Sequence, residues 1–221
     1  MDAPKFERPA PLPDNRQSTP MNANGDTPKV ERPAPLQSWV GLTPEAEAAL
    51  PIDDADGGCD DQPPCKTASP WRRQIEAIEI RDGDAITDSA EAFYLMRQRG
   101  ITNVIVMGVH ENMCVLGRPF SIRQMVRLGQ NVALLRDLTD TMYNSRSKPN
   151  VNHFIGTDLV AWHIERYWCP TFTSDQIVGG RPFRFAGDAG PVRRFEDYVR
   201  FFPPAPAKKA SAPSAAGSGA R

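Results

Sequence analysis

The stretch from Ile101 to Leu116 constrains the fold more than any other part of this 221-residue chain. It is an apolar run rich in β-branched residues, which ends in a short loop and then reaches Cys114. A continuous apolar run is typical of a strand buried in a parallel sheet. In open α/β sheets, ligands bind beyond the carboxyl ends of the strands. The sequence therefore places Cys114 where a reactive side chain is expected.

Helix and strand patterns alternate on both sides of this run. The expected strands cover residues 102–108, 131–135 and 171–178. The expected helices cover residues 89–99, the stretch from the cysteine loop to 128, and 156–168. Gly100 and Gly129 follow two of these helices as stop signals. Strands that alternate with helices favour an α/β fold with a mostly parallel sheet.

Composition divides the chain into three parts. Residues 1–70 hold 13 of the 22 prolines and show no periodicity, so we expect them to be mostly irregular. Within them Glu-Arg-Pro-Ala-Pro-Leu occurs twice, at 7–12 and 31–36, either as a duplicated extended segment or as a polyproline-type ligand. Residues 71–202 form the expected α/β domain with an aromatic C-terminal arm, and residues 203–221 form an expected disordered tail.

The net charge and the distribution of apolar residues limit which partners the chain can be expected to bind. The net charge of −1 provides no basic field that would attract nucleic acid or an anionic membrane. There is no apolar run of 18 residues and no secretion-signal pattern at the N-terminus, so the sequence as written is expected to be cytoplasmic. His153 and His163 lack the i, i+4 spacing of a helical metal pair, and nothing indicates a cofactor.

The four cysteines are too few for a disulfide scaffold in a chain of this length. Cys59 and Cys65 flank an acidic, proline-containing loop and could form a disulfide in an oxidising environment, which the sequence leaves open. Cys169 is expected to pack at a helix end. For Cys114, the alternative to a nucleophile is a small buried apolar residue.

With Gly-Val-His-Glu-Asn-Met-Cys-Val placed at the end of a strand, residues 75–185 resemble the isochorismatase-like cysteine hydrolases, which include nicotinamidases. In that superfamily a Gly-x-x-Thr-x-x-Cys-Val loop carries the nucleophile. The later Thr-Asp-Leu-Val-Ala-Trp-His-Ile-Glu helix and the Thr-Phe-Thr-Ser-Asp strand also fit its order. The resemblance implies a three-layer α/β/α domain with a mostly parallel sheet.

The resemblance also implies a chemistry. Cys114 would attack the carbonyl carbon of a small amide or related acyl substrate, as a thiolate. The backbone N–H groups of Met113 and Cys114 would stabilise the oxyanion. His110 and Asn112 are candidates for substrate contact, and for His110 the alternative is a loop histidine bonded to the backbone. The peptide between Val109 and His110 would be cis.

Three departures from the superfamily pattern affect this hypothesis. Glu111 replaces the loop threonine, which puts a carboxylate near a thiolate. No lysine occurs between Lys66 and Cys114, although Asp88 falls near the expected place. Nothing before Ile75 reads as a buried strand that ends in aspartate. The general-base aspartate and the lysine of the superfamily are therefore not identified in this chain.

The missing first strand has a structural consequence. In the superfamily it pairs beside the strand that leads to the cysteine, so without it we expect an unpaired, apolar sheet edge. We interpret the sequence as an N-terminally incomplete or divergent version of the fold, which also makes the localisation depend on the true start. The alternative to a hydrolase is a catalytically inactive relic that acts as a scaffold or interaction protein.

Two further groups of side chains have expected structural roles. Arg118, Arg123 and Arg127 are spaced so that they need not share one helical face, and we expect them to be solvated rather than to bind an anionic substrate. Aromatic side chains alternate with arginines from Phe183 to Phe202. This arm is expected to pack on its own core or on a second subunit, as in a homo-oligomer.

Overall fold

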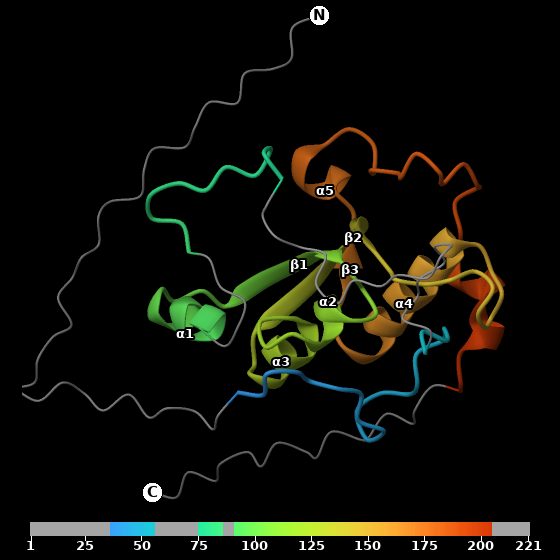
Figure 1. Cartoon of the computed structure of the whole chain (residues 1–221), viewed down its shortest axis with the longest axis horizontal. Coiled ribbons are helices and arrows are strands. Elements are labelled where there is room, and N and C mark those ends of the chain that lie inside the picture. The colour runs from blue at the N-terminus through green and yellow to red at the C-terminus, as the bar shows by residue number, and fades with distance from the viewer. Residues whose placement is uncertain (1–35, 56–74, 86–90, 205–221) are drawn as a thin grey trace, which may run out of the picture. The chain divides into compact units, whose positions relative to one another are not determined.

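The computed structural model describes residues 36–55, 75–85 and 91–204 (Figure 1). In chain order the elements are α1 (Glu91–Gln98), β1 (Asn103–Val109), α2 (Cys114–Gly117), α3 (Ile122–Arg127), β2 (Asn131–Asp140), α4 (His153–Tyr167), β3 (Thr171–Phe172), α5 (Asp175–Val178) and two 3-10 turns, Phe195–Asp197 and Val199–Phe201. The possible Cys59–Cys65 disulfide and nearly all of the Pro-rich repeats and the C-terminal tail lie outside the described residues.

The three strands form one parallel sheet in the order β1-β2-β3 (Figure 1). This confirms the expected α/β class. β1 and β2 are in register from Asn103 opposite Asn131 to Val106 opposite Leu134. The register then shifts, so that Gly108 pairs with Thr139, and residues 135–138 stand opposite Met107 alone. This bulge lets β2 extend to Asp140, five residues beyond the strand predicted from the sequence.

The helices begin and end where local chemistry dictates. The helix expected after the cysteine loop is split into α2 and α3 on either side of Pro119, which cannot donate a backbone hydrogen bond. α4 begins at His153, three residues earlier than predicted, because the Asn152 side chain accepts a hydrogen bond from Phe154 N at 2.9 Å. An asparagine at this position is a favourable helix cap.

The strand predicted over residues 171–178 was wrong beyond its first two residues. β3 ends at Phe172 and α5 follows. Ser174 donates to the Asp137 carboxylate from its backbone N at 2.9 Å and from Oγ at 2.6 Å. These bonds from β2 turn the chain away from the sheet, so no further pairing with β2 occurs within the described residues.

One apolar core joins the sheet to the helices. α2 packs against β1, α3 against β2, and α4 against both β2 and β3. Leu134 of β2, Leu116 of α2 and Leu159 of α4 are all completely buried in it, and side chains of this type each contribute about 1.5–3 kcal/mol when removed from water. Part of the aromatic arm joins this core through Phe202, so its expected packing on its own domain is confirmed there.

A buried polar cluster fixes the segment before residue 55. Glu47 is completely buried and accepts hydrogen bonds from Arg123 Nε at 2.6 Å, Trp168 Nε1 at 2.8 Å and the ring of His163 at 2.8 Å. Burial acts to raise the pKa of Glu47, but His163, Arg123 and Trp168 together hold it below its ordinary value. The prediction that Arg123 is solvated was wrong, because its guanidinium is buried and also donates to Val40 O.

The loop between β2 and α4 is built around one tyrosine. Tyr143 is buried, its hydroxyl donates to Ser147 O at 2.9 Å, and it accepts from Val151 N at 3.3 Å. Its ring lies on α4 at Gly156, where a Cβ atom would come within 2.3 Å of the tyrosine Cδ1. The close approach of ring and helix therefore requires glycine at this position.

Candidate functional site

The candidate site begins where β1 ends. Gly108 has φ +105°, a conformation that favours glycine, and it lies at the register shift with β2. The peptide between Val109 and His110 is cis, as the resemblance implied. Residues 110–113 then form a turn, and Cys114 is the first residue of α2. Cys114 therefore lies at the carboxyl end of β1, and its side chain is half-buried.

A groove of about 600 Å³ runs beside Cys114. Its walls are mostly apolar: Val104, Ile105, Val106, Met107, Val109, Cys114, Val115, Arg118, Phe120 and Ser121. Only Cys114 and Arg118 among these carry titratable side chains. The groove thus offers a thiol, one guanidinium and one hydroxyl, that of Ser121, in otherwise apolar surroundings.

The groove follows an open edge of the sheet. Among the described strands, β1 pairs only with β2, and its other edge has no neighbour. Val104 and Val106 pack against the core, but Ile105, Met107 and Val109 are 54%, 58% and 50% exposed. Parallel strands are usually covered on both faces. In the described part of the chain, β1 thus has one open edge and one exposed apolar face, which Ile105, Met107 and Val109 form.

Hydrogen bonds to the end of β2, to the residue pair after it and to the segment before residue 55 hold the loop that carries Cys114. Glu111 N donates to Asp140 O at 2.8 Å. The Asn112 side chain is buried, donates to Asp54 Oδ2 at 2.8 Å and accepts from Met142 N at 2.9 Å. The amide predicted to contact substrate thus ties the loop to two other segments.

The two backbone N–H groups predicted to stabilise an oxyanion differ in whether they already donate a hydrogen bond. Met113 N already donates to His110 O at 3.0 Å. Cys114 N has no backbone acceptor among the described residues outside its own helix. Of the two, Cys114 N–H is therefore the one that a bound carbonyl oxygen could use.

His110 and Glu111 have shifted pKa values in this loop. Burial lowers the pKa of His110, and the negative charge of Asp140 opposes this shift only in part. Glu111 is completely buried, and neither of its carboxylate oxygens has a hydrogen-bond partner among the described residues. Burial raises its pKa well above the ordinary value, which favours the neutral acid. At Glu111, burial thus disfavours the charged carboxylate that the sequence suggested beside the thiol.

Asp140 is a site residue that sequence reasoning missed. Its Oδ1 accepts from His153 Nε2, from Thr157 Oγ1 and from Thr141 N at 2.9–3.0 Å. Burial acts to raise the pKa of Asp140, but these bonds and the charge of His153 hold it below its ordinary value. The strand predicted from the sequence ended at residue 135, so no pattern placed Asp140 at a strand end; in the structure Val109 is its register partner. Asp140 links the Cys114 loop to α4.

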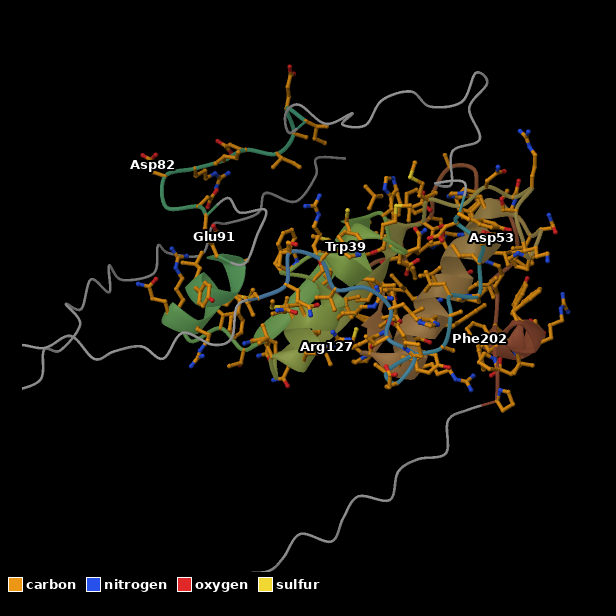
Figure 2. All side chains as sticks on the ribbon, turned by 60° about the horizontal axis from the view of Figure 1, so that its bottom comes forward. Trp39, Asp53, Asp82, Glu91, Arg127 and Phe202 are labelled. Atoms are coloured by element: carbon orange, nitrogen blue, oxygen red, sulfur yellow. The ribbon has the colours of Figure 1, made fainter. Side chains whose placement is uncertain are left out.

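Trp39, which is labelled in Figure 2, contacts α2 at Gly117. Val40 N donates to Gly117 O at 2.7 Å. A Cβ atom at Gly117 would lie 2.6 Å from the Trp39 ring, so the two segments are in direct contact. Arg127 is exposed and donates to Thr43 Oγ1 at 3.0 Å, as expected of a solvated side chain.

The other cysteine of the described part differs from Cys114. Cys169 is buried directly after α4, as expected for a residue at a helix end. Burial raises the pKa of its thiol to about 12. Ionisation, which a nucleophilic thiol needs, is therefore disfavoured at Cys169.

In residues 36–55, 75–85 and 91–204, no three His, Cys, Asp or Glu side chains converge as a metal site would require. Of the helices in these ranges, none combines the length and the apolar character that crossing a bilayer needs.

Comparisons with known proteins were made at three levels. The chain matches no family model, no curated protein and no solved structure. What the site can do is thus argued from its own residues.

Proposed function

We propose that the chain is an isochorismatase-like cysteine hydrolase, of three-layer α/β/α architecture, in which Cys114 attacks a small amide or related acyl compound. One observation carries this proposal: a half-buried thiol at the carboxyl end of a parallel strand, beside a groove of about 600 Å³. A groove of this size is typical of small-molecule sites.

The proposed reaction has two steps. The Cys114 thiolate forms a C–S bond with the carbonyl carbon, and the amine takes up a proton and leaves. Water then cleaves the thioester to release the acid and restore the thiol. The N–H of Cys114 stabilises the oxyanion in both steps. Hydrolysis of this kind needs no metal or redox cofactor.

His110, which lies in the Cys114 loop and not in the lining of the groove, is our candidate for substrate contact and for proton transfer. Its lowered pKa keeps the ring neutral near pH 7, and a neutral imidazole can accept a proton. It lies four residues before Cys114 in the same loop, whose turn is closed by the Met113 and Val115 N–H groups donating to His110 O.

A second candidate function is a non-catalytic scaffold that retains the fold. The composition of the groove favours it, because none of the residues that line the groove is a carboxylate, a lysine or a histidine. Such a protein would keep Cys114 as a small apolar side chain.

Thiol alkylation separates the two functions. The whole chain is treated with iodoacetamide from pH 6 to 9, and peptide mass spectrometry follows Cys114, with Cys169 as the internal reference. A hydrolase predicts labelling of Cys114 well below pH ~8.5, where an ordinary thiol ionises, and ammonia release from a panel of small primary amides that Cys114→Ser abolishes. Ordinary or absent labelling, together with no release from any amide, would refute the hydrolase and support the scaffold.

A further inference from the structure

A second cavity, of about 330 Å³, lies away from the Cys114 groove. It forms where residues 182–193 pass over the bulged part of β2 and the first turns of α4. The two cavities have no lining residue in common. Its volume is at the small end of the range of about 300–1,000 Å³ that small-molecule sites occupy, which suits a ligand of one or two rings.

Aromatic rings form one wall of this cavity. Phe154 and Phe185 are stacked, with ring centroids 6.1 Å apart and planes inclined by 21°. Phe183 meets Phe185 edge-on at 5.2 Å and is 45% exposed. Rings in offset-stacked and edge-on arrangements attract further aromatic rings by the same geometry. The wall thus favours a flat, aromatic ligand over an aliphatic one.

Five of the six charged side chains that line the cavity form ion pairs with one another. The lining includes three arginines and three aspartates, so their formal charges cancel. Arg193 binds Asp188 with two hydrogen bonds of 2.7 and 2.9 Å and also donates to Asp158. Asp158 in turn accepts from Arg136 at 3.0 Å. Because each of these charges has an opposite partner, a charged ligand would have to displace one of them.

The third aspartate of the cavity lining, Asp137, has hydrogen-bond donors other than arginine. Asp137 accepts hydrogen bonds from Ser174 N, Ser174 Oγ and Phe183 N, at 2.6–3.0 Å. These bonds also hold the start of residues 182–193 over β2. The loop is therefore fixed in the absence of any ligand, and the cavity is preformed.

We propose that this cavity is a binding site for a neutral, planar aromatic ring. The ring packs against the aromatic wall formed by Phe154, Phe183 and Phe185. The site is separate from the proposed hydrolase chemistry and does not depend on Cys114.

Adenine is a suitable probe, measured by calorimetry on the whole chain. We expect saturable binding with a dissociation constant of about 1 mM or tighter, and at least ~10-fold weaker binding of benzoate, which is flat but charged, and of cyclohexanol, which is neutral but not aromatic. Cys114→Ser should bind adenine as the parent does.

Two substitutions locate the binding. Phe185→Leu removes an aromatic face but keeps apolar volume, and we expect it to weaken adenine binding by at least ~5-fold. Phe183→Leu should do the same from an exposed position, where loss of folding is not expected. Phe201→Leu, in the stacked Tyr198–Phe201 pair outside the cavity, is the matched control and should have no effect. Absence of saturable binding, equal binding of benzoate, or equal affinity in all three variants would overturn the proposal.

Discussion

The two sides of the sheet differ in how completely they are closed. Beside β2 and β3, α4 and the aromatic arm bury Leu134 and Leu159 completely. Beside β1, the row of Ile105, Met107 and Val109 is about half exposed in the described part of the chain. We infer that the closed side supplies most of the stability, while the open side leaves Cys114 accessible from its groove.

The same difference appears in the polar groups. On the closed side the charges are paired and buried or half-buried, as in the clusters around Glu47 and Asp158. Among the residues that line the groove on the open side, Arg118 is the one with a charged side chain. Substitutions on the two sides should therefore differ both in the property that they change and in the size of the effect.

The largest effect is expected for Arg123→Ala. It leaves the carboxylate of Glu47 buried without its guanidinium partner, which typically costs about 3–5 kcal/mol in the free energy of unfolding. Arg127→Ala on the same helix is the control, because that side chain is exposed, and should change stability by less than ~0.5 kcal/mol. Urea unfolding at pH 7 measures both, and equal losses would contradict the role given to the buried cluster.

A pair of substitutions in neighbouring strands tests the comparison directly. Leu134→Ala in β2 should cost about 2–5 kcal/mol because it opens a cavity in the core. Met107→Ala in β1 should cost less than ~0.5 kcal/mol because that side chain is 58% exposed. If urea unfolding gave Met107→Ala a cost as large as that of Leu134→Ala, the face of β1 would have to be covered in solution.

Glu111→Gln should have a smaller effect that depends on pH. The raised pKa of Glu111 keeps it protonated in the folded state, while in the unfolded chain it ionises above its ordinary value of 4.5. The parent therefore loses stability as pH rises above that value, and the variant does not. Between pH 5 and pH 7, the free energy of unfolding of the variant should therefore rise relative to that of the parent by roughly 1–3 kcal/mol. Thermal or urea unfolding at several pH values would show a constant difference if Glu111 were ionised in the fold.

Ile105→Lys should affect association more than stability. An apolar strand edge promotes pairing with other chains, and a lysine on it suppresses such pairing. We expect the unfolding free energy to stay within ~0.5 kcal/mol and light scattering of concentrated protein to fall. Val104→Lys is the matched control, since Val104 packs against the core and its replacement should destabilise the fold. Unchanged scattering in Ile105→Lys would show that this edge does not mediate association.

Sequence patterns over a few neighbouring residues predicted those strands and helices whose formation depends on local sequence. The apolar run placed β1 within one residue at each end, and the parallel α/β class followed from the alternation of elements. The position of Cys114 at the end of that strand was also predicted. The second half of β2 was missed because Arg136 and Asp137 interrupt the apolar run, and only the bulge restores pairing with β1.

The remaining errors involve partners distant in sequence. Arg123 appeared to be a surface residue because its carboxylate partner, Glu47, lies 76 positions away. Asp140 was not singled out because its partners His153 and Thr157 are 13 and 17 positions further on. No local pattern encodes such contacts, and the state of Glu111 likewise depends on how completely tertiary packing buries it.

The contact between Tyr143 and Gly156 has a consequence for sequence variation. With a ring atom where a methyl group at 156 would have to lie, neither position can change freely while the other stays the same. A smaller side chain at 143 would admit alanine at 156, but it would also remove the hydroxyl that joins Ser147 to Val151. In a library of random variants, these two sites should accordingly show strong epistasis, with the parental pair recovered together.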